Sequence, residues 1–416
     1  MDKIKIAIIG GGAAGMMAAI YAADGGADVT LIEKGNACGR KLRITGKGRC
    51  NLTNDSALNE FMQNVPTNPR FLYSALSFFS TEDTQSFFES EGVPLKVERG
   101  KRVFPVSDRA DDIVRCLVDA CKKRGVRIYN GKARHISVSD GSVCGVTVYE
   151  ELIEADRVII ATGGMSYPRT GSDGDGYRMA RELGHSVTAL IPSLVPLVSR
   201  SKICPQMQGL SLKNVSLTVI DKRSGKRVYE DFGEMMFTHF GITGPMVLSA
   251  SAHLSDIEEG RYEAFINLKP ALDEKALDTR ILSDFSKYGN KDFVNSLDDL
   301  LPQKMIPVII KLSGIPERKK VNSITKEERQ RLASLIQALP VSLDGFRPIS
   351  EAIVTKGGVC VKEINPKTME SKLVSGLYFA GEIIDVDAYT GGFNLQRAFS
   401  TGALAGSNAA ENIFKL

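Results

Sequence analysis

The chain has 416 residues, of which 43% are hydrophobic and 25% charged, and its formal net charge at pH 7 is +4. This length and composition are typical of a globular protein with roughly two or three domains. Basic and acidic residues are interspersed, as at 317–320 and 326–329, so the sequence indicates no basic face and we expect no nucleic-acid partner.

The seven cysteines and four histidines lack the spacing of metal sites or redox pairs. An odd number of cysteines without a Cys-x-x-Cys motif argues against a disulfide framework, and no His-Glu-x-x-His motif indicates a metal. The uncharged run 6–23 contains four glycines, which make it a poor bilayer helix, and no cleavable leader pattern is present. We therefore expect a cytoplasmic protein that does not enter a membrane.

The segment from Ile4 to Glu33 has the pattern of a dinucleotide-binding βαβ unit, with a glycine-rich turn between an apolar strand and a helix of small residues. Gly10 would form the tight turn, Gly12 would admit a pyrophosphate, and Gly15 would let helix and strand pack closely. Glu33 ends the second strand, where its carboxylate can accept hydrogen bonds from both ribose hydroxyls of an adenosine. It would repel a 2′-phosphate, so FAD or NAD fits better than NADP. A glycine-rich turn in an unrelated α/β domain is the alternative.

A loop rich in glycine and basic residues follows at 38–54, and we expect it to lie along the cofactor. The periodicity then predicts helical stretches at 68–91 and 110–124. Strands are predicted at 126–129, 134–139, 143–149 and 157–161, and the last of these ends in the turn Thr162-Gly163-Gly164.

Beyond residue 190, prolines and alternating strands such as 215–220 and 228–231 predict an antiparallel, barrel-like substrate domain. From 270 to 339 the pattern becomes charged and helical, with candidate helices at 271–288, 291–300 and 326–338. Strand character returns at 350–361, and 376–382 indicates a last parallel strand that rejoins the first domain. The predicted organisation is an α/β dinucleotide-binding Rossmann domain at 1–190 and 358–416, a β-barrel-like substrate domain at 191–269 and 340–357, and a helical insert at 270–339.

A second glycine turn near the C-terminus favours FAD, which is long enough to be held at both ends. Gly391-Gly392-Phe393-Asn394 opens a helix expected to run to about Phe414. Its free N–H groups could point at the flavin N1–C2=O edge, which becomes negative when the flavin is reduced. Gly381 and Glu382 would lie near the pyrophosphate and the ribityl chain, although both turns could also be ordinary helix caps.

Several motifs of the chain resemble the BaiN-like flavoproteins, a family also described as aminoacetone-oxidase-like or NAD(FAD)-utilising dehydrogenases. The resemblance spans nearly the whole chain and implies FAD, a glutathione-reductase-like Rossmann domain, a β-barrel-like domain and a small helical insert. Because the family includes bile-acid-type enone reductases and amine oxidases, it does not define the substrate. The motifs are 48–54 (GRCNLTN), 161–164 (ATGG), 237–245 (FTHFGITGP), 355–359 (TKGGV), and 381–382 (GE) with 391–394 (GGFN).

The resemblance also implies a set of cofactor contacts. Related flavoproteins often have Asp where this chain has Glu382, so its contact with the ribityl hydroxyl is open. The expected contacts are Ala13 and Ala14 at the pyrophosphate; Glu33 at the adenosine ribose, with Lys34, Arg40 and Lys41 nearby; Gly48, Arg49, Cys50 and Asn51 along the flavin; the backbone of Ala133 at the adenine; and Thr162, Gly163 and Gly164 on the phosphate side.

Flavin carries the redox chemistry, so the protein must position a substrate and manage one proton. His239, between two phenylalanines, is the best titratable candidate, although a structural imidazole fits equally well. Tyr167 could donate a proton to a developing enolate or could simply pack beside the cofactor. Arg49 and Lys47 could lower the pKa of Cys50, although a lone cysteine is usually a small buried hydrophobe. Lys356 could face the flavin, an anionic substrate or solvent.

We predict an FAD-dependent oxidoreductase that transfers hydride between flavin N5 and a small or medium organic substrate, with an NAD(P)H-driven enone-type reductase as one form. The chain has only one full dinucleotide fingerprint, and Asp173 and Asp175 in the glycine cluster 171–176 would repel a second pyrophosphate. NAD(P)H would therefore bind transiently over the flavin, or oxygen would accept the electrons. The alternatives are an oxygen-using amine oxidase, a flavin-dependent RNA-modifying protein and a redox sensor acting through Cys50. The sequence defines neither the substrate nor the oligomeric state.

Overall fold

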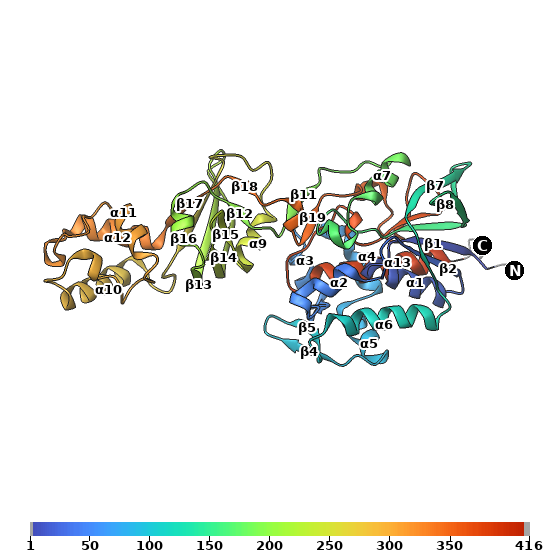
Figure 1. The fold of residues 1–416 in the computed structure, drawn as a ribbon, viewed down its shortest axis with the longest axis horizontal. Coiled ribbons are helices and arrows are strands. Elements are labelled where there is room, and N and C mark those ends of the chain that lie inside the picture. The colour runs from blue at the N-terminus through green and yellow to red at the C-terminus, as the bar shows by residue number, and fades with distance from the viewer. Residues whose placement is uncertain (1–2, 412–416) are drawn as a thin grey trace. The chain divides into compact units, whose positions relative to one another are not determined.

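The computed structural model describes residues 3–411, which divide into two units. Unit 1 comprises the chain up to Ser193 and from Ile349 onward, and unit 2 comprises Leu194–Pro348. Figure 1 labels most of their helices and strands. Within residues 3–411, no helix is both long and apolar enough to span a lipid bilayer.

The centre of unit 1 is a five-stranded parallel sheet in the order β20-β10-β1-β2-β6. Four consecutive apolar residues of β1 are fully or almost fully buried, as expected for a central parallel strand covered on both faces. The predicted Rossmann architecture is confirmed. The strands are β1 (Lys5–Ile9), β2 (Asp28–Glu33), β6 (Arg127–Asn130), β10 (Arg157–Ile160) and β20 (Leu377–Phe379).

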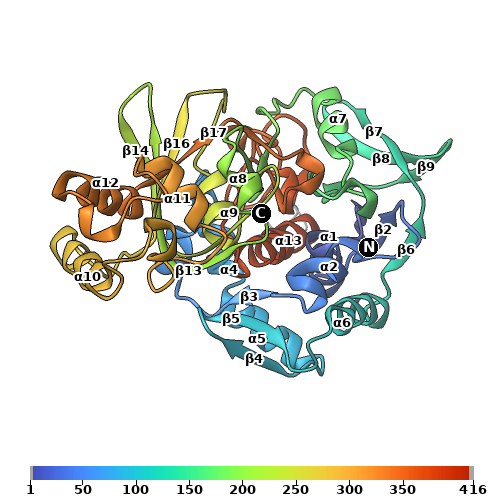
Figure 2. The ribbon, with the colours of Figure 1, turned by 60° about the vertical axis from the view of Figure 1, so that its left-hand side comes forward.

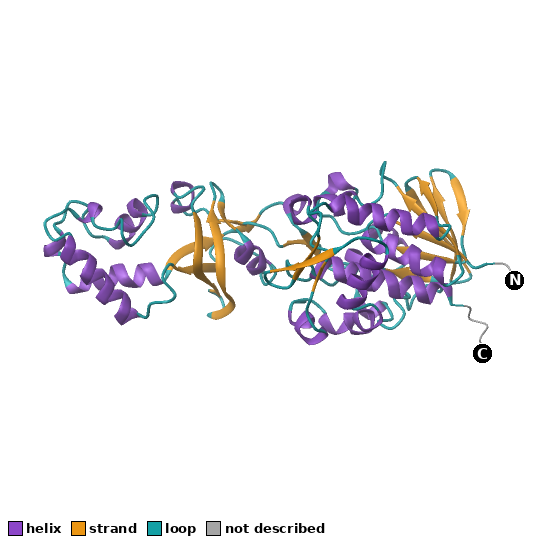
Figure 3. Ribbon diagram, turned by 90° about the horizontal axis from the view of Figure 1, so that it is seen from below, coloured by secondary structure: helices purple, strands orange, loops and turns teal. Residues whose placement is uncertain are grey.

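Two helices from opposite ends of the chain, α1 (Ala13–Asp24) and α13 (Phe393–Ala410), pack tightly against each other beside this sheet. A Cβ atom on Gly402 would lie 2.4 Å from the carbonyl oxygen of Ala14, so only glycine permits this approach. Figure 3 shows the helices of unit 1 alongside the sheet. The C-terminal helix is thereby fixed next to the N-terminal glycine turn, and Phe414, where we expected it to end, lies outside the described residues.

Smaller elements complete unit 1. The predicted helical stretch 68–91 is interrupted, because Ser80 forms a capping box that starts a new helix. A three-stranded antiparallel meander, β7-β8-β9, precedes β10 (Figure 2). The helices are α2 (Arg40–Ile44), α3 (Leu58–Gln63), α4 (Tyr73–Phe78), α5 (Thr81–Ser90), α6 (Ala110–Lys123) and α7 (Asp175–Glu182); the strands are β3 (Thr53–Asn54), β4 (Leu95–Glu98), β5 (Arg102–Pro105), β7 (Ala133–Ser139), β8 (Ser142–Val148), β9 (Glu151–Glu154), β11 (Ile191–Ser193) and β19 (Val354–Lys356).

Unit 2 is built on a seven-stranded antiparallel sheet in the order β17-β16-β13-β14-β15-β12-β18. Its two edge strands are separated along the chain by Asp344 alone, so the sheet must curl to bring its edges together, as in the predicted barrel-like domain. The strands are β12 (Leu197–Val198), β13 (Ser211–Asp221), β14 (Lys226–Phe237), β15 (Gly241–Thr243), β16 (Tyr262–Asn267), β17 (Leu339–Leu343) and β18 (Gly345–Phe346).

The stretch 270–339 of unit 2 is helical, but not everywhere as predicted. The expected helix at 291–300 is wrong: the backbone N–H groups of Phe293 and Val294 bond to the loop at Lys319 and Glu317, leaving one short 3₁₀ turn. We missed α11 (Ile306–Ser313), which has Pro307 in its first turn and ends at Gly314. The helices of unit 2 are α8 (Ile203–Gln206), α9 (Pro245–Ser251), α10 (Glu274–Lys287), α11 (Ile306–Ser313) and α12 (Lys326–Gln337).

The return from unit 2 to unit 1 differs from the predicted boundary at 358. Residues 349–357 belong to unit 1, because β19 pairs with β11 and Thr355 bonds to Glu382. Strand structure in the predicted stretch 350–361 is limited to β19, since Gly357 follows with a positive φ of 90°. Both connections between the units therefore run through the short β11–β19 pair.

Candidate cofactor site

The first glycine turn has the geometry that a pyrophosphate requires. Gly10 has φ 108°, and a Cβ on it would lie 2.6 Å from the carbonyl oxygen of Ala161. A Cβ on Gly15 would lie 1.9 Å from the carbonyl oxygen of Gly10, so helix α1 can approach the turn only with glycine there. In contrast, a Cβ on Gly12 would meet nothing within 4 Å. The space beside Gly12, at the N-terminus of α1, is therefore open to a phosphate.

Glu33 organises the turn as well as ending β2. Its Oε2 accepts the N–H of Gly11 at 2.8 Å, and its Oε1 accepts the N–H of Gly35 at 2.6 Å. Each carboxylate oxygen retains a second lone pair, so both can also accept ribose hydroxyls. The carboxylate is thus fixed in orientation before any ribose binds.

Lys34 neutralises the carboxylates that we expected to repel a second pyrophosphate. Its Nζ lies 2.5 Å from Asp173 Oδ1 and 2.8 Å from Asp175 Oδ2, and Lys132 also reaches Asp175. Burial opposes the charged form, but Lys34 and Lys132 hold the pKa of Asp175 below its ordinary value. The repulsion argument is therefore weaker than the sequence suggested, and Lys34 itself is occupied by these two partners.

The basic loop is tied to the first turn through Gly39, whose N–H bonds to the carbonyl of Gly11 at 2.8 Å. Arg40 follows at the start of α2 and donates to the carbonyl of Arg169 at 2.7 Å. The guanidinium of Arg49 stacks 4.1 Å over the Phe104 ring and pairs with Glu98 and Asp108.

At the end of this loop, Gly48 and Cys50 have positive φ, and the Cys50 side chain is fully buried. Burial raises the pKa of the Cys50 thiol to about 12. This direction agrees with the alternative of a small buried hydrophobe and not with a thiolate, because Arg49 pairs with two carboxylates and the Cys50 side chain is buried. All seven cysteines are free thiols.

The turn after β10 is hydrogen-bonded to the C-terminal segment, since the N–H of Met165 donates to the Thr355 hydroxyl at 2.8 Å. Gly163 has φ 77°, and a Cβ on Gly164 would lie 2.4 Å from the Thr355 hydroxyl.

Ala133, which we expected at the adenine, lies at the start of β7, where it is 5% exposed and pairs with Val148.

Glu382 connects the N-terminal and C-terminal halves of the site. Its Oε2 accepts Lys41 Nζ at 2.7 Å, and its Oε1 accepts the Ser166 hydroxyl and the Thr355 N–H at 2.9 Å each. Burial raises the pKa of Glu382, but the cations of Lys41 and Arg397 outweigh it and hold that pKa below its ordinary value. Both carboxylate oxygens therefore already have partners within the chain.

The second glycine turn precedes α13 as predicted. Gly391 and Gly392 have φ of 119° and 101°, and a Cβ on Gly392 would lie 2.2 Å from the carbonyl oxygen of Thr53. Phe393 packs edge-on against Phe61 at 5.1 Å, and Asn394 bonds to Ala388 through both its amide oxygen and nitrogen. The positive end of an 18-residue helix is thereby held rigidly at this turn.

Our sequence analysis missed the buried polar residues around Glu382. Ser166 and Thr355 are fully buried, and Asp387 and Arg397 are 0% and 1% exposed. Asp387 accepts the Ser193 hydroxyl at 2.8 Å. A clue was available in α13, where Arg397 stands in a helix composed mainly of small and apolar residues.

These residues fit FAD. The side-chain oxygens of Asn51 and Thr162 are buried and make no hydrogen bond within the described chain, so they can serve polar groups of a bound cofactor. The open space at Gly12, the oriented Glu33 carboxylate and the N-terminus of α13 supply positions for the pyrophosphate, the adenosine ribose and the flavin pyrimidine edge.

The three catalytic candidates are in different surroundings. Tyr167 is half-buried and has φ 53° beside Ser166, within the unit that carries the cofactor residues. His239 belongs to unit 2, where it is exposed in the turn between β14 and β15 and packs edge-on against Phe240 at 5.0 Å. Cys50 is inaccessible, as described above.

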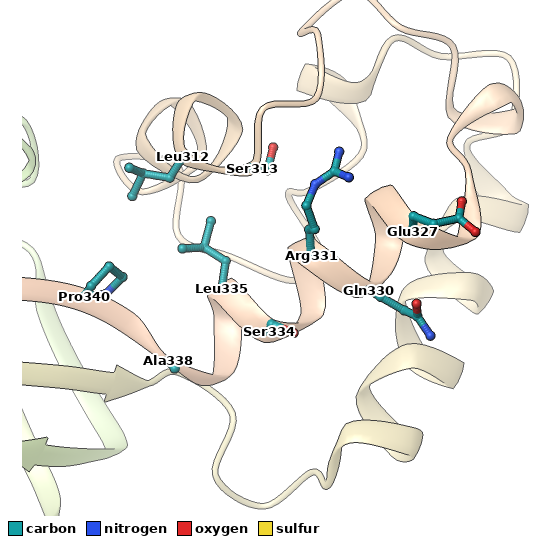
Figure 4. Close-up of a pocket in the computed structure, with 9 residues that line it drawn as sticks. All are labelled: Leu312, Ser313, Glu327, Gln330, Arg331, Ser334, Leu335, Ala338 and Pro340. Carbon is teal, nitrogen blue, oxygen red and sulfur yellow. The ribbon is translucent and has the colours of Figure 1, made fainter. Parts of the chain in front are cut away.

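A groove of about 690 Å³ lies in unit 2 on α11 and α12 (Figure 4). Leu312 and Leu335 line it together with Arg331 and Glu327. None of the predicted cofactor residues contributes to this groove. In the described part of the chain, no three His, Cys, Asp or Glu side chains form a group suited to a metal ion.

Comparison with known proteins gives matches along nearly the whole chain. The family model described as "HI0933-like protein Rossmann domain" matches residues 4–408. The 3-dehydro-bile acid delta(4,6)-reductase of Clostridium scindens is 32% identical over 412 residues, which cover 98% of this chain and 99% of the relative. The ribosomal RNA dihydrouridine synthase of Escherichia coli is 32% identical over 402 residues, with 96% of each protein covered.

A solved structure supports the fold. The 3-ketosteroid-delta4-(5alpha)-dehydrogenase of Rhodococcus jostii, crystallised with 4-androstene-3,17-dione, aligns with a TM-score of 0.54 and 18% identity. The alignment covers 98% of this chain and 97% of that protein. At this identity the match concerns the architecture alone.

Proposed function

The chain belongs to the HI0933-like Rossmann family and is an FAD-dependent oxidoreductase, and we propose that it reduces a carbon–carbon double bond conjugated to a carbonyl group. One observation carries the proposal: two relatives of near-complete coverage are named for reductions of this type. A 3-dehydro bile acid has a ketone beside its Δ4 bond, and uridine becomes dihydrouridine by saturation of the double bond next to its C4 carbonyl. The two names therefore share a reaction although their substrates differ greatly in size.

The residues of the chain have defined tasks in this proposal. When bound, FAD supplies the hydride at N5. The turn at Gly12 holds the pyrophosphate, Glu33 holds the adenosine ribose, and the N-terminus of α13 stabilises the negative pyrimidine edge of the reduced cofactor. The carbon next to the carbonyl must also gain a proton, and we assign Tyr167 and His239 as the candidate donors.

The electron donor in this proposal is NAD(P)H, bound transiently over the flavin. Transient binding is supported by the single dinucleotide fingerprint, which we assign to FAD and which leaves NAD(P)H no such turn of its own. We also propose a cytoplasmic location, which the seven free thiols support because thiols stay reduced in that compartment.

The test is an anaerobic half-reaction. The flavin of the purified protein is reduced with NADH or NADPH and then mixed with a 4-en-3-oxo steroid, while the flavin absorbance is followed. Reoxidation together with the mass gain of two hydrogens in the steroid is the expected result. If no conjugated alkene reoxidises the flavin and an amine instead yields peroxide in air, the protein is an oxidase and the proposal is wrong.

A second candidate substrate, uridine in ribosomal RNA, is favoured by the full-length similarity to the Escherichia coli protein. It runs against our expectation that no nucleic acid binds, which rests on the near-balanced charge. The same reduced protein is mixed anaerobically with ribosomal RNA, and dihydrouridine is sought by mass spectrometry of the digested nucleosides. Flavin reoxidation by RNA and not by the steroid, weakened by added salt, would select this candidate.

A further inference from the structure

Four charged side chains form a buried ion cluster in unit 1: Lys41, Glu382, Asp387 and Arg397. The Lys41 and Glu382 side chains are 22% and 11% exposed and pair at 2.7 Å. Asp387 and Arg397 are 0% and 1% exposed, and the charges of Glu382 and Asp387 both favour the charged form of Arg397, although its Nε and Nη1 make no hydrogen bond within residues 3–411. Because taking such charges out of water is costly, packing alone does not explain a cluster of this kind in place of apolar side chains.

The two carboxylates of the buried ion cluster each hold one of the strands that connect the units. Asp387 Oδ2 accepts the hydroxyl of Ser193, the last residue of β11, at 2.8 Å. Glu382 Oε1 accepts the backbone N–H of Thr355, the central residue of β19, at 2.9 Å. The chain enters unit 2 directly after β11 and returns shortly before β19, so both bonds hold strands of unit 1 that border the two crossings of the chain.

The β11–β19 pair needs such attachments because it is too small to be stable alone. It has three residue pairs, and one member, Pro192, has no N–H to donate. Ser193 and Thr355 are both fully buried, and the bond between Ser193 and Asp387 is buried at both ends, so it does not compete with water. A lost bond here leaves a buried carboxylate oxygen without its donor.

The carboxylates also belong to the segment that we assign to the cofactor. Glu382 follows Gly381 directly, and Asp387 lies four residues before Gly391, so both stand between the two C-terminal glycine turns. The same short segment therefore faces the expected ribityl chain and pyrimidine edge and holds both connecting strands.

We propose that Glu382 and Asp387 are positioning residues that fasten the two connections of unit 2 to the flavin-binding segment, with Lys41 and Arg397 as their counter-ions. This rests on the proposed function only in that the segment binds FAD. The carboxylates act through β11 and β19 rather than on a substrate. How readily β11 and β19 open therefore depends on residues of the cofactor site.

The experiment is hydrogen exchange measured by mass spectrometry on the full-length protein loaded with FAD. In Asp387→Asn, the amides in peptides covering 188–195 are expected to exchange roughly tenfold faster, because strand opening costs less free energy. Asp284→Asn is the matched control, since Asp284 is a 2% exposed carboxylate paired with Arg280 on α10. It should leave these peptides unchanged.

A gentler pair of variants keeps the test decisive if Asp387→Asn does not fold. Ser193→Ala removes one hydroxyl and leaves all four charges, and should loosen the same peptides, whereas Ser193→Thr keeps the hydroxyl and should restore protection. Equal exchange in Ser193→Ala and wild type, or loosening spread evenly over unit 1, would overturn the proposal. FAD content and steroid or RNA turnover are measured separately, so a wrong substrate leaves the exchange result intact.

Discussion

Replacing Gly12 by alanine should separate cofactor binding from folding. Gly12 has φ −85° and ψ −168°, which alanine adopts without strain, and its added Cβ would meet no atom within 4 Å. Alanine lowers the conformational entropy of the unfolded chain, which stabilises the protein, but it is a poorer N-cap than glycine. The two effects nearly cancel, so the free energy of unfolding of the FAD-free variant should lie within about 0.5 kcal/mol of that of wild type. Yet the methyl group fills the space where the pyrophosphate must approach the N-terminus of α1.

The expected loss of FAD affinity follows from the phosphate contacts at this turn. If the methyl group prevents about two charge-assisted hydrogen bonds of roughly 1.5–3 kcal/mol each, binding weakens by about 3–6 kcal/mol, or roughly 10²–10⁴-fold in Kd. Titration of the FAD-free protein with FAD, followed by quenching of flavin fluorescence, measures this change. Thermal unfolding of the same FAD-free samples measures stability.

Gly15→Ala is the contrasting variant, because its Cβ would lie 1.9 Å from the carbonyl oxygen of Gly10. Overpacking at this contact should destabilise the FAD-free protein by about 3 kcal/mol. A Gly12→Ala protein that binds FAD with wild-type affinity would refute the assignment of this turn to the pyrophosphate. Equal destabilisation by both variants would refute the distinction between open and packed glycines.

Cys50→Ser should keep the flavin spectrum and all reductive turnover, because a thiol with its pKa raised to about 12 contributes no thiolate near neutral pH; loss of reduction in stopped-flow traces would contradict this. Tyr167→Phe should slow substrate reduction at least tenfold while flavin reduction by NAD(P)H is unchanged, and an equal effect on both half-reactions would argue for packing instead. Burial lowers the pKa of His185 from its ordinary 6.5. As the pH falls, the unfolded chain therefore binds a proton at this histidine at a higher pH than the folded chain does. The free energy of unfolding should consequently decrease as the pH drops below about 6.5. His185→Gln, with its hydrogen bond to Ser371 retained, should flatten that part of a denaturant-midpoint versus pH curve.

The cofactor turns could be predicted from the sequence because each depends on neighbouring residues. Gly10, Gly12 and Gly15 act within one strand–turn–helix, and the structure gives each the surroundings expected for its role. The parallel sheet was equally predictable, since a run of buried apolar residues such as that of β1 fits a strand covered on both faces. Local rules failed at 291–300, where distant backbone groups replaced helical hydrogen bonds.

Partners that are far apart in the sequence lie beyond such rules. Lys41 and Glu382 are separated by 341 positions, and Ser193 and Asp387 by 194, so no spacing pattern could pair them. The possibility of a lowered pKa at Cys50 fails for the same reason: Arg49 precedes it directly, but the Arg49 guanidinium pairs with Glu98 and Asp108 from a separate part of the chain.

Arg397 nevertheless shows that part of the buried ion cluster has a sequence signal. Arg397 is the one charged residue of α13, a helix composed mainly of small and apolar residues. The structure buries it, and a buried charge requires a partner of opposite sign. The only acids close in sequence before this helix are Glu382, Asp385 and Asp387. A lone charge in this helix, close in sequence to three acids, is thus a sequence signal for charged residues near the second glycine turn, although not for the strands that the carboxylates hold.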